Sequence, residues 1–518
     1  MPERWFLAID LGTSDLKIGA VSAKGALLAH HTAPVDTQFL PGGGAVQDTA
    51  QWRELLRDGV RSVAESTGPD RSGLAGVGIT GQWGSTVPVG EGGEPVGPCM
   101  LWSDTRGAPY SAKVLGGPVA PFGYSPEKIV PWIRITGGAP SPHGADPLSH
   151  ELYLRNREAE TYARTKLLLE PLDFIGLHLT GRAAATPGSS VLSWLADNRP
   201  GARTAYVPDL IRRSTRDPGR LPELIGTGSV LGRVRPELAE DMGIAEVPVV
   251  AGVSDAHSAF LGSGAVAPYE AHVTISTTCW ISCEVPFKKT DVFHQIASVP
   301  GLRPGRYLVI DNQETAGLCL KWLRDGLVPG EYMDLTALAA TAPPGSDGVM
   351  FTPWLNGERT PVEDRTLRGA FLNLSVASTR AHMVRAVLEG VAFNARWLLE
   401  SVERFVGRRL DRLRIQGGGA QSDLWCQVYA DVLDRPMERI AEPRFHSLRG
   451  AGLFAAVSLG EMAIDDIPAL VPLSDTFLPR EAHRDVYDRM FREFRRFYGR
   501  LHGSYSRLNS RMVDANGG

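Results

Sequence analysis

The sequence has little that would suit a secreted, membrane-bound or zinc-binding protein. Its 518 residues include five cysteines, and although Cys279 and Cys283 form a CxxxC, no second pair or histidine cluster completes a zinc site. No apolar run approaches the roughly 18 residues that span a bilayer. The N-terminal stretch also lacks the basic and apolar regions of a signal peptide. We therefore expect reduced thiols and a cytoplasmic protein without a membrane partner.

An excess of charge of one sign is also missing. With 54 basic and 58 acidic residues the net charge is -4, which gives no electrostatic reason to expect nucleic acid as a partner. Hydrophobic residues make up 43% and charged residues 22%, values typical of a globular protein with a full core. The length predicts two or more domains.

Two familiar nucleotide-binding motifs are excluded. No GxxxxGK[ST] occurs, so the chain has no P-loop. The segment GVGITG, residues 76–81, has the spacing of the dinucleotide fingerprint, which must follow a strand and open a helix. Here Val77 and Ile79 alternate with glycines as if the segment were itself a strand. We therefore reject a Rossmann-type site.

Apolar periodicity predicts an α/β chain with a weak internal repeat. Each half opens with two strands joined by a turn of small hydroxyl residues, at 6–21 and at 271–285. We also predict helices at 48–66 and from 378 to about 405, and a strand at 247–255. Residues 107–150, rich in glycine and proline, are expected to be an irregular insertion, and residues 503–518 a flexible tail.

The first of these turns carries more chemistry than a hairpin needs. Asp10 ends the strand, Gly12, Thr13 and Ser14 follow, and Lys17 lies in the next strand. Backbone N–H groups at a glycine turn form an anion-binding concavity, to which hydroxyl groups add donors. Gly12 would let the backbone approach a phosphate closely, and Asp10 could bind Mg²⁺. An ordinary polar hairpin is the alternative.

The second turn offers the same donors in Ser276, Thr277 and Thr278, so the two turns could clamp one polyphosphate from both sides. Asp255 ends another apolar strand. A carboxylate within reach of an acceptor hydroxyl is a suitable base for phosphoryl transfer. We predict that Asp255 is this base and that Asp255 and Asp10 both serve a metal. The alternative for Asp255 is a strand-end residue that caps the following helix.

A glycine-rich segment, QGGGAQSDLW, could receive a flat base. Gly417, Gly418 and Gly419 would let the base lie against bare backbone, with Gln421 and Ser422 near its edge. A tight strand-to-helix connection is the alternative.

The segment LWSDTRG places Trp102, Asp104 and Arg106 at alternate positions, on one face of an extended stretch. Asp104 and Arg106 could hydrogen bond to vicinal hydroxyls, and Trp102 could cover the apolar face of a sugar. A surface ion pair is the alternative.

Taken in order, several segments resemble the FGGY family of carbohydrate kinases, within the actin-like ATPase superfamily. They are AIDLGTS, GITGQW, LWSDTR, AGVSDAHSAFLGSGAV, NGERTP, the stretch 369–389 with Asn373 where glycine is usual, QGGGAQSDLWCQVYADVLDRP and RGAGLFAAVSLG. The resemblance implies a two-lobed, ribonuclease H-like fold with duplicated cores around a cleft. We place the lobes at 1–264 and 265–502. It also implies ATP and Mg²⁺, a sugar or polyol acceptor, and a homodimer.

The resemblance assigns roles by position. Asp255 would be the base and Asp10 would serve the metal. Phosphate would be contacted by Gly12, Thr13, Ser14 and Thr277; adenosine by Gly418, Gly419 and Ser422; and the sugar by Gln82, Trp83 and Asp104.

The residues that depart from the family pattern stand at positions expected to bind the acceptor. Xylulose kinases usually carry Met-His and glycerol kinases Arg-Glu where this chain has Trp83 and Gly84, and xylulose kinases place Asn where Ala256 stands. We therefore predict intact phosphoryl-transfer machinery and an altered sugar pocket. The acceptor we expect is a ketopentose such as xylulose. The alternatives are another sugar or polyol, an actin- or chaperone-like ATPase directed at a protein, and a catalytically weak family member.

Overall fold

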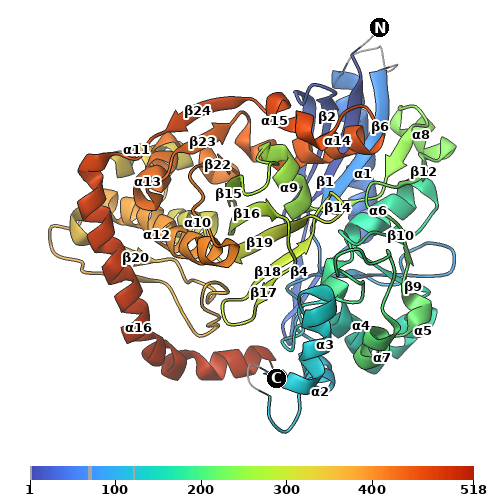
Figure 1. Ribbon diagram of the computed structural model, residues 1–518, viewed down its shortest axis with the longest axis horizontal. Coiled ribbons are helices and arrows are strands. Elements are labelled where there is room, and N and C mark those ends of the chain that lie inside the picture. The colour runs from blue at the N-terminus through green and yellow to red at the C-terminus, as the bar shows by residue number, and fades with distance from the viewer. Residues whose placement is uncertain (1–2, 68–72, 121–122, 518) are drawn as a thin grey trace.

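The computed structural model describes residues 3–67, 73–120 and 123–517, with the backbone alone for 510–517. Two large β-sheets, each flanked by helices, organise the chain (Figure 1). The first sheet uses strands between residues 5 and 254, and the second uses strands between 271 and 477. The division of the chain at 264/265 stays a prediction.

The first sheet has seven strands. In spatial order they are β12 (Val230–Arg233), β13 (Pro248–Val250), β6 (Leu74–Gly81), β1 (Trp5–Leu11), β2 (Asp15–Ser22) and β3 (Leu27–Pro34), with β14 (Val253–Ser254) also paired to β6. The strand expected at 247–255 is therefore split into β13 and β14. Because GVGITG lies within β6, the rejection of a dinucleotide fingerprint there is confirmed.

The second sheet has eight strands. In spatial order they are β17 (Thr290–Asp291), β18 (Ile296–Pro300), β19 (Tyr307–Gln313), β16 (Cys279–Val285), β15 (Ala271–Ile275), β22 (Leu413–Gln416), β23 (Met437–Ile440) and β24 (Leu473–Phe477). In both sheets an antiparallel hairpin, β1–β2 or β15–β16, has its first strand parallel to a later one, β6 or β22. The predicted internal repeat is confirmed.

The remaining strands form small sheets. They are β4 (Gln38–Leu40), β5 (Gly44–Gln47) and β8 (Cys99–Met100); β7 (Val87–Val89) and β9 (Leu167–Leu169); β10 (Ala184–Ala185) and β11 (Glu223–Leu224); and β20 (Met350–Thr352) and β21 (Ala370–Leu372).

The α-helices are α1 (Thr49–Ser66), α2 (Ala108–Leu115), α3 (Pro126–Thr136), α4 (Pro147–Arg157), α5 (Ala159–Arg164), α6 (Pro171–Thr180), α7 (Pro208–Ser214), α8 (Pro236–Met242), α9 (Asp255–Ser263), α10 (Gly317–Gly326), α11 (Tyr332–Ala340), α12 (Arg380–Val406), α13 (Asp423–Leu433), α14 (His446–Ser458), α15 (Ile467–Leu470) and α16 (Glu481–Gly517). Short 3-10 helices are η3 (Val191–Ser193), η4 (Pro218–Arg220), η5 (Ser346–Gly348), η6 (Gly418–Gln421), η7 (Pro443–Phe445) and η8 (Ile464–Asp466).

Strand β1 is buried along its whole length, and its alternation decides where Asp10 points. Leu7 and Ile9 join the core cluster that contains Trp52 of α1, whereas Ala8 joins the cluster that contains Ala451 of α14. Because successive side chains of a strand face opposite sides of the sheet, Asp10 faces the side of α14. Helix α9 packs against α14 on this side (Figure 1).

Helices α9 and α14 come from different halves of the chain and cross closely at glycines. A Cβ atom added at Gly450 would lie 1.8 Å from the carbonyl oxygen of Ser258, and one added at Gly262 would lie 1.8 Å from that of His446. Gln416 at the end of β22 strengthens the junction, since its Nε2 donates to the Ala259 carbonyl at 3.1 Å. Helix α9 is thereby held against α14 and against the second sheet.

The expectation that residues 107–150 are irregular is wrong. Helices α2 and α3 lie in this range, and α4 begins in it. Pro131 lies inside α3, but three of the prolines stand in the first turns of these helices, at Pro109, Pro126 and Pro147, where the missing N–H costs nothing. Glycines then end two of them, and Gly137 adopts a left-handed φ of 96° after α3.

The segment expected to be a flexible tail, 503–518, continues α16 as far as Gly517. Asn509 anchors this helix, because its Nδ2 donates to the Thr366 carbonyl at 2.8 Å. All five cysteines are free and buried. In the part of the chain that the structure describes, no helix is both long and apolar enough to span a bilayer.

Candidate active site

Two carboxylates meet at the ends of neighbouring strands in the first sheet. Asp10 on β1 lies opposite Lys17 on β2, whose Nζ is 3.5 Å from Asp10 Oδ2, and beside Thr80 on β6. Ser254 pairs with Gly81 at the end of β6, so Asp255, the next residue, emerges at the same edge. The topology therefore brings Asp10, Lys17 and Asp255 to one place, as the strand-end pattern predicted.

The electrostatics of Asp255 reflect these neighbours. Burial raises the pKa of Asp255 to about 7, and the negative charge of Asp10 adds to the increase. The Ala256 N–H, which donates to Oδ1 at 2.8 Å, and the positive charge of Lys17 lower this pKa, with smaller effects. A carboxylate with a pKa near neutrality is suited to general base catalysis, because it is basic yet largely ionised near pH 7.5.

The donor set fits Mg²⁺ bound together with phosphate. Among the described residues, no group of three or more His, Cys, Asp or Glu side chains could hold a metal ion. Mg²⁺ commonly keeps several waters and takes only one or two protein carboxylates together with substrate phosphates. Asp10 and Asp255 supply that number of carboxylates, so they suit a metal that arrives with a nucleotide.

The residues of the turn between β1 and β2 have two different roles. The Gly12 N–H donates to the Asp15 carbonyl at 3.0 Å and closes the turn. Thr13 Oγ1 accepts a hydrogen bond from Trp102 Nε1 at 3.1 Å and donates to Gln82 Oε1 at 3.4 Å. Thr13 therefore joins the turn to the residues expected to face the sugar, while the exposed Ser14 is the hydroxyl directed outward.

The second turn leaves one hydroxyl directed to solvent. Ser276 Oγ donates to the Thr278 carbonyl at 3.1 Å, and Thr278 Oγ1 accepts from Trp280 Nε1 at 2.6 Å. The Thr277 carbonyl is held by the Ala316 N–H at 2.8 Å, and its side chain is exposed. Thr277 is thus the member of this turn best placed to donate to a ligand.

The glycine segment lies against the second turn. Gly417 has a φ of 92°, and a Cβ there would lie 2.4 Å from the Ile275 carbonyl; a Cβ at Gly419 would lie 2.4 Å from Ile275 Cγ2. Gly418 faces open space. Ser422 caps α13 by accepting from Trp425 N–H at 3.2 Å. The segment is therefore both a tight strand-to-helix connection and a bare surface at Gly418, next to which Gln421 is exposed.

This difference between the glycines gives a test of the nucleotide site. Gly418→Val should fold normally, because its φ is not left-handed and the side chain has space. We expect it to raise KM for ATP at least tenfold by occupying the surface offered to the base. Gly326→Val, also in open space but at the end of α10, is the control. Steady-state kinetics with an unchanged KM for Gly418→Val would place the base elsewhere.

On the acceptor side, Gln47 is a residue that the sequence did not indicate. Its Nε2 donates to the Thr13 carbonyl at 2.7 Å, and its Oε1 accepts from Gln82 Nε2 at 3.0 Å. Gln47 and Gln82 are both buried. This chain of bonds fixes the orientation of Gln82, the first of the predicted sugar-facing residues.

Trp83 packs against a second residue that the sequence did not indicate, His257. The two rings meet edge to face, with centroids 6.5 Å apart. His257 Nδ1 lies 2.8 Å from Ser254 Oγ and Nε2 lies 2.8 Å from the Pro300 carbonyl, so both ring nitrogens are engaged. Burial lowers the pKa of His257. His257 therefore holds Trp83 in place and has no nitrogen left for a ligand.

Gly84 follows Trp83 with a left-handed φ of 77°, and a Cβ there would lie 2.8 Å from Leu192 Cδ1. A larger residue at this position would be strained. In this loop conformation position 84 therefore supplies no polar side chain, in contrast to the His or Glu that the family resemblance leads one to expect there.

Asp104 and Arg106 bind each other. Arg106 Nη2 lies 2.7 Å from Asp104 Oδ2, which also accepts the Ala45 N–H at 3.0 Å. The Arg106 and Asp104 side chains are 11% and 0% exposed, so the pair is no surface ion pair. A role of either residue towards the sugar stays a prediction. Through Ala45 in β5 the pair fixes the strand that carries Gln47. Trp102, from the same segment, is the residue that contacts Thr13.

Comparison with known proteins matches two parts of this chain to the two domains of one family. Residues 5–117 match the N-terminal domain of the FGGY family of carbohydrate kinases, and residues 283–459 match its C-terminal domain. Together these ranges cover more than half of the chain.

Individual relatives match over nearly the whole length. The chain is 27% identical to a xylulose kinase of Lactococcus lactis, over 99% of both chains, and 24% identical to a gluconokinase of Bacillus subtilis, over 93% of this chain and 92% of the relative. Among solved structures, a xylulose kinase from Rhodospirillum rubrum superposes with a TM-score of 0.82 at 26% identity, covering 97% of this chain and 100% of that one. The predicted two-lobed actin-like fold is confirmed.

Proposed function

The chain belongs to the FGGY family of carbohydrate kinases and is an ATP-dependent phosphotransferase with an alcohol group as acceptor, and we propose that its acceptor is a ketopentose such as xylulose. The observation that carries the proposal is the meeting of Asp10, Lys17 and Asp255 at one sheet edge, next to a chain of bonds that reaches Gln82 and Trp102. Similarity to xylulose kinases over the whole chain supports the choice of sugar.

In the proposed mechanism the acceptor hydroxyl lies beside Asp255. Its oxygen forms a bond to the γ-phosphorus of ATP, the bond from that phosphorus to the β–γ bridging oxygen breaks, and ADP leaves. The hydroxyl proton passes to the Asp255 carboxylate. Thr277, Ser14 and the Gly12 backbone would face the phosphates, and Lys17 offsets the charge of Asp10. Mg²⁺, held through Asp10 and Asp255, would neutralise phosphate charge.

Two further parts of the proposal concern adenosine and the apolar face of the sugar. Gly418, Gly419, Gln421 and Ser422 would border adenosine, and Trp83 and Trp102 would cover an apolar face of the sugar. A homodimer and a cytoplasmic location stay predictions. Since a gluconokinase is among the relatives, a sugar acid is the second candidate acceptor. Because Trp83, Gly84 and Ala256 differ from the family pattern, other polyols are also candidate acceptors.

A substrate screen tests the proposal. Purified protein would be assayed for ADP release with Mg-ATP across pentuloses, hexuloses, aldoses, sugar acids and polyols. Turnover that depends on a ketopentose supports the proposed acceptor. Turnover on gluconate alone moves the acceptor to the sugar-acid class. Hydrolysis that no sugar stimulates would favour an ATPase directed at another partner.

The raised pKa of Asp255 predicts an acidic limb in the pH profile. Below about pH 7 the carboxyl becomes protonated and can no longer accept a proton, so kcat/KM should fall tenfold per pH unit. Saturation with Mg²⁺ adds positive charge beside Asp255 and should move the limb to lower pH. The measurement is kcat/KM for the acceptor between pH 5 and 9 in approximate half-unit steps. A kcat/KM that stays flat down to pH 5 at both low and saturating Mg²⁺ would contradict the assignment, because the pKa of Asp255 would then lie near the ordinary aspartate value of 3.8.

A further inference from the structure

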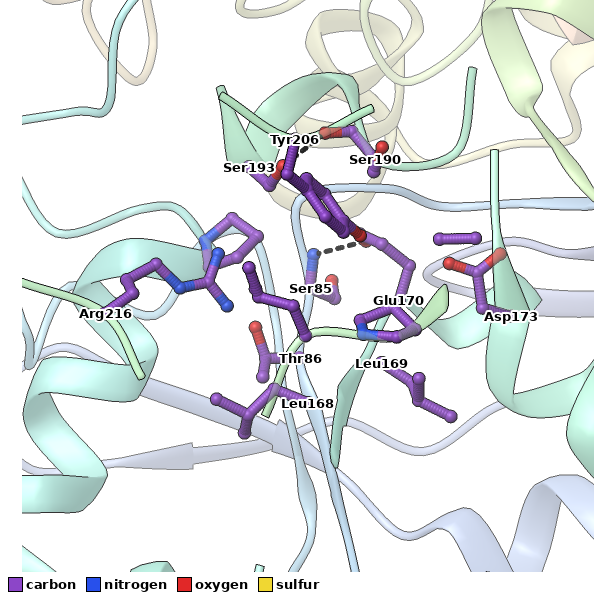
Figure 2. A pocket seen from close by; sticks show the side chains of 14 residues that line it. Ser85, Thr86, Leu168, Leu169, Glu170, Asp173, Ser190, Ser193, Tyr206 and Arg216 are labelled. Carbon is purple, nitrogen blue, oxygen red and sulfur yellow. Dashed lines mark hydrogen bonds between the residues drawn. The ribbon is translucent and has the colours of Figure 1, made fainter. Parts of the chain in front are cut away.

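A small cavity lies behind the loop that follows Gln82. Its volume is about 20 Å³, and its lining includes Ser85, Glu170, Asp173 and Arg216 (Figure 2). This is room for one water molecule, whereas pockets for organic ligands take roughly 300 Å³ or more. The cavity is therefore no substrate site. Two buried acids, Glu170 and Asp173, lie beside it.

Glu170 is bonded to the backbone of that loop. It precedes α6 and is 6% exposed. The Ser85 N–H donates to Glu170 Oε2 at 3.2 Å, the bond drawn in Figure 2, and the nearby Gly84 N–H helps to lower the pKa of this carboxyl. Ser85 is 1% exposed, so losing this acceptor would leave a buried N–H unpaired. Glu170 therefore fixes the loop at the peptide group that joins Gly84 to Ser85.

The anchored residues lead directly to the acceptor side. Ser85 Oγ accepts the Trp102 N–H at 3.0 Å and donates to Gln82 Oε1 at 3.5 Å. Gly84, held in its left-handed conformation, follows Trp83. Residues 82–85 thus lie between the Glu170 carboxyl on one side and Thr13 and Trp102 on the other.

We propose that Glu170 is a positioning residue for the acceptor sugar, which holds Gln82, Trp83 and Trp102 in their binding arrangement through the Gly84 and Ser85 backbone. This inference rests on the proposed function, because it concerns the same acceptor. Glu170 acts from behind the loop and lies one layer of backbone away from the sugar. Its loss should weaken binding of the acceptor and leave the adenosine side of the nucleotide site, which the second sheet supplies, unchanged.

Asp173 provides a matched control. It lies one turn further along the same helix, lines the same cavity, is 2% exposed and accepts the Ser189 hydroxyl at 3.1 Å. It has no bond to residues 82–86 among the hydrogen bonds of the described residues. Burial raises the pKa of both Asp173 and Glu170 well above the ordinary values. Neutral amides are therefore close mimics of both side chains.

Three variants test the proposal. Glu170→Met keeps the length of the side chain but removes the acceptor oxygens, and should raise KM for the acceptor at least tenfold with KM for ATP within twofold of the parent. Glu170→Gln keeps one oxygen for the Ser85 N–H and should restore the acceptor KM to within threefold. Asp173→Asn should leave it unchanged. An acceptor KM that is unaffected in Glu170→Met, equally impaired in Glu170→Gln, or equally raised in Asp173→Asn would overturn the proposal.

Amide hydrogen exchange separates this inference from the proposed function. In the parent protein the Ser85 amide should exchange as slowly as the core of β6, and Glu170→Gln should keep that protection. This measurement needs neither a substrate nor the folding of Glu170→Met. If no sugar is phosphorylated, the proposed function fails alone. If the Ser85 amide exchanges rapidly in the parent protein, the positioning role of Glu170 fails whatever the substrate is.

Discussion

Asp255→Asn should lower kcat by about 10²–10⁴-fold at saturating ATP, Mg²⁺ and acceptor, the range that a general base contributes. The reason lies in where Asp255 stands. It follows Ser254 at the end of β14, beside Asp10, in a site that raises its pKa to about 7. Asparagine fills the same space and can accept a hydrogen bond, but it cannot take the acceptor proton. The measurement is steady-state ADP release together with single-turnover phosphorylation of the sugar.

Asp423→Asn is the matched control. Asp423 also follows a serine N-cap and also opens a helix, α13, but its carboxylate is exposed and bound to Arg439. Asp423, like Asp255, lies at the start of a helix, but it has no buried acidic neighbour. The kcat of Asp423→Asn should therefore stay within twofold of the parent value. Retention of more than a tenth of kcat by Asp255→Asn would move the base elsewhere. Sugar-independent hydrolysis that survives the change would instead favour the ATPase alternative.

The features that the sequence predicted best are those in which local pattern and chemistry coincide. A strand that ends in a carboxylate places it at the sheet edge whatever the rest of the chain does, and this brought Asp10 and Asp255 together. The two hydroxyl turns were identifiable because strand periodicity of two flanks each of them. Asn373, where the family usually has glycine, adopts a φ of 61°, a conformation that asparagine tolerates better than most residues.

Other features depend on contacts between distant segments, and no local pattern encodes these. Gln47 acts through Thr13 and Gln82, and Glu170 acts through Ser85, yet each looks ordinary among its sequence neighbours. The alternate spacing of Asp104 and Arg106 predicted one face of an extended stretch, and this was wrong, because residues 101–107 lie in turns, with the Asp104 N–H donating to the Leu101 carbonyl at 2.8 Å. The pattern also could not show that Asp104 is buried. Residues 107–150 were misassigned because proline and glycine, which interrupt helices, also begin and end them.

The second large effect is expected at the crossing of α9 and α14, in Gly450→Ala. The new methyl group would lie 1.8 Å from the Ser258 carbonyl, so the two helices must separate. Overpacking of this kind costs roughly 3 kcal/mol. Ser258 is one turn from Asp255, and its hydroxyl binds Thr80 Oγ1 at 2.8 Å, so a shift of α9 also moves the base. Because a displacement of about 1 Å can cost 10²-fold in rate, kcat should fall by about that factor.

Gly499→Ala shows what the same change does without a neighbour. Gly499 lies inside α16 with open space around its Cβ position, and alanine there should stabilise the protein by about 0.5–1 kcal/mol with no change in kcat. Urea unfolding midpoints and kcat would be measured for both variants. A lower midpoint with normal kcat in Gly450→Ala would mean that α9 moves as a unit with the first sheet. In that case the crossing supports the fold, and the position of Asp255 is set by β14 alone.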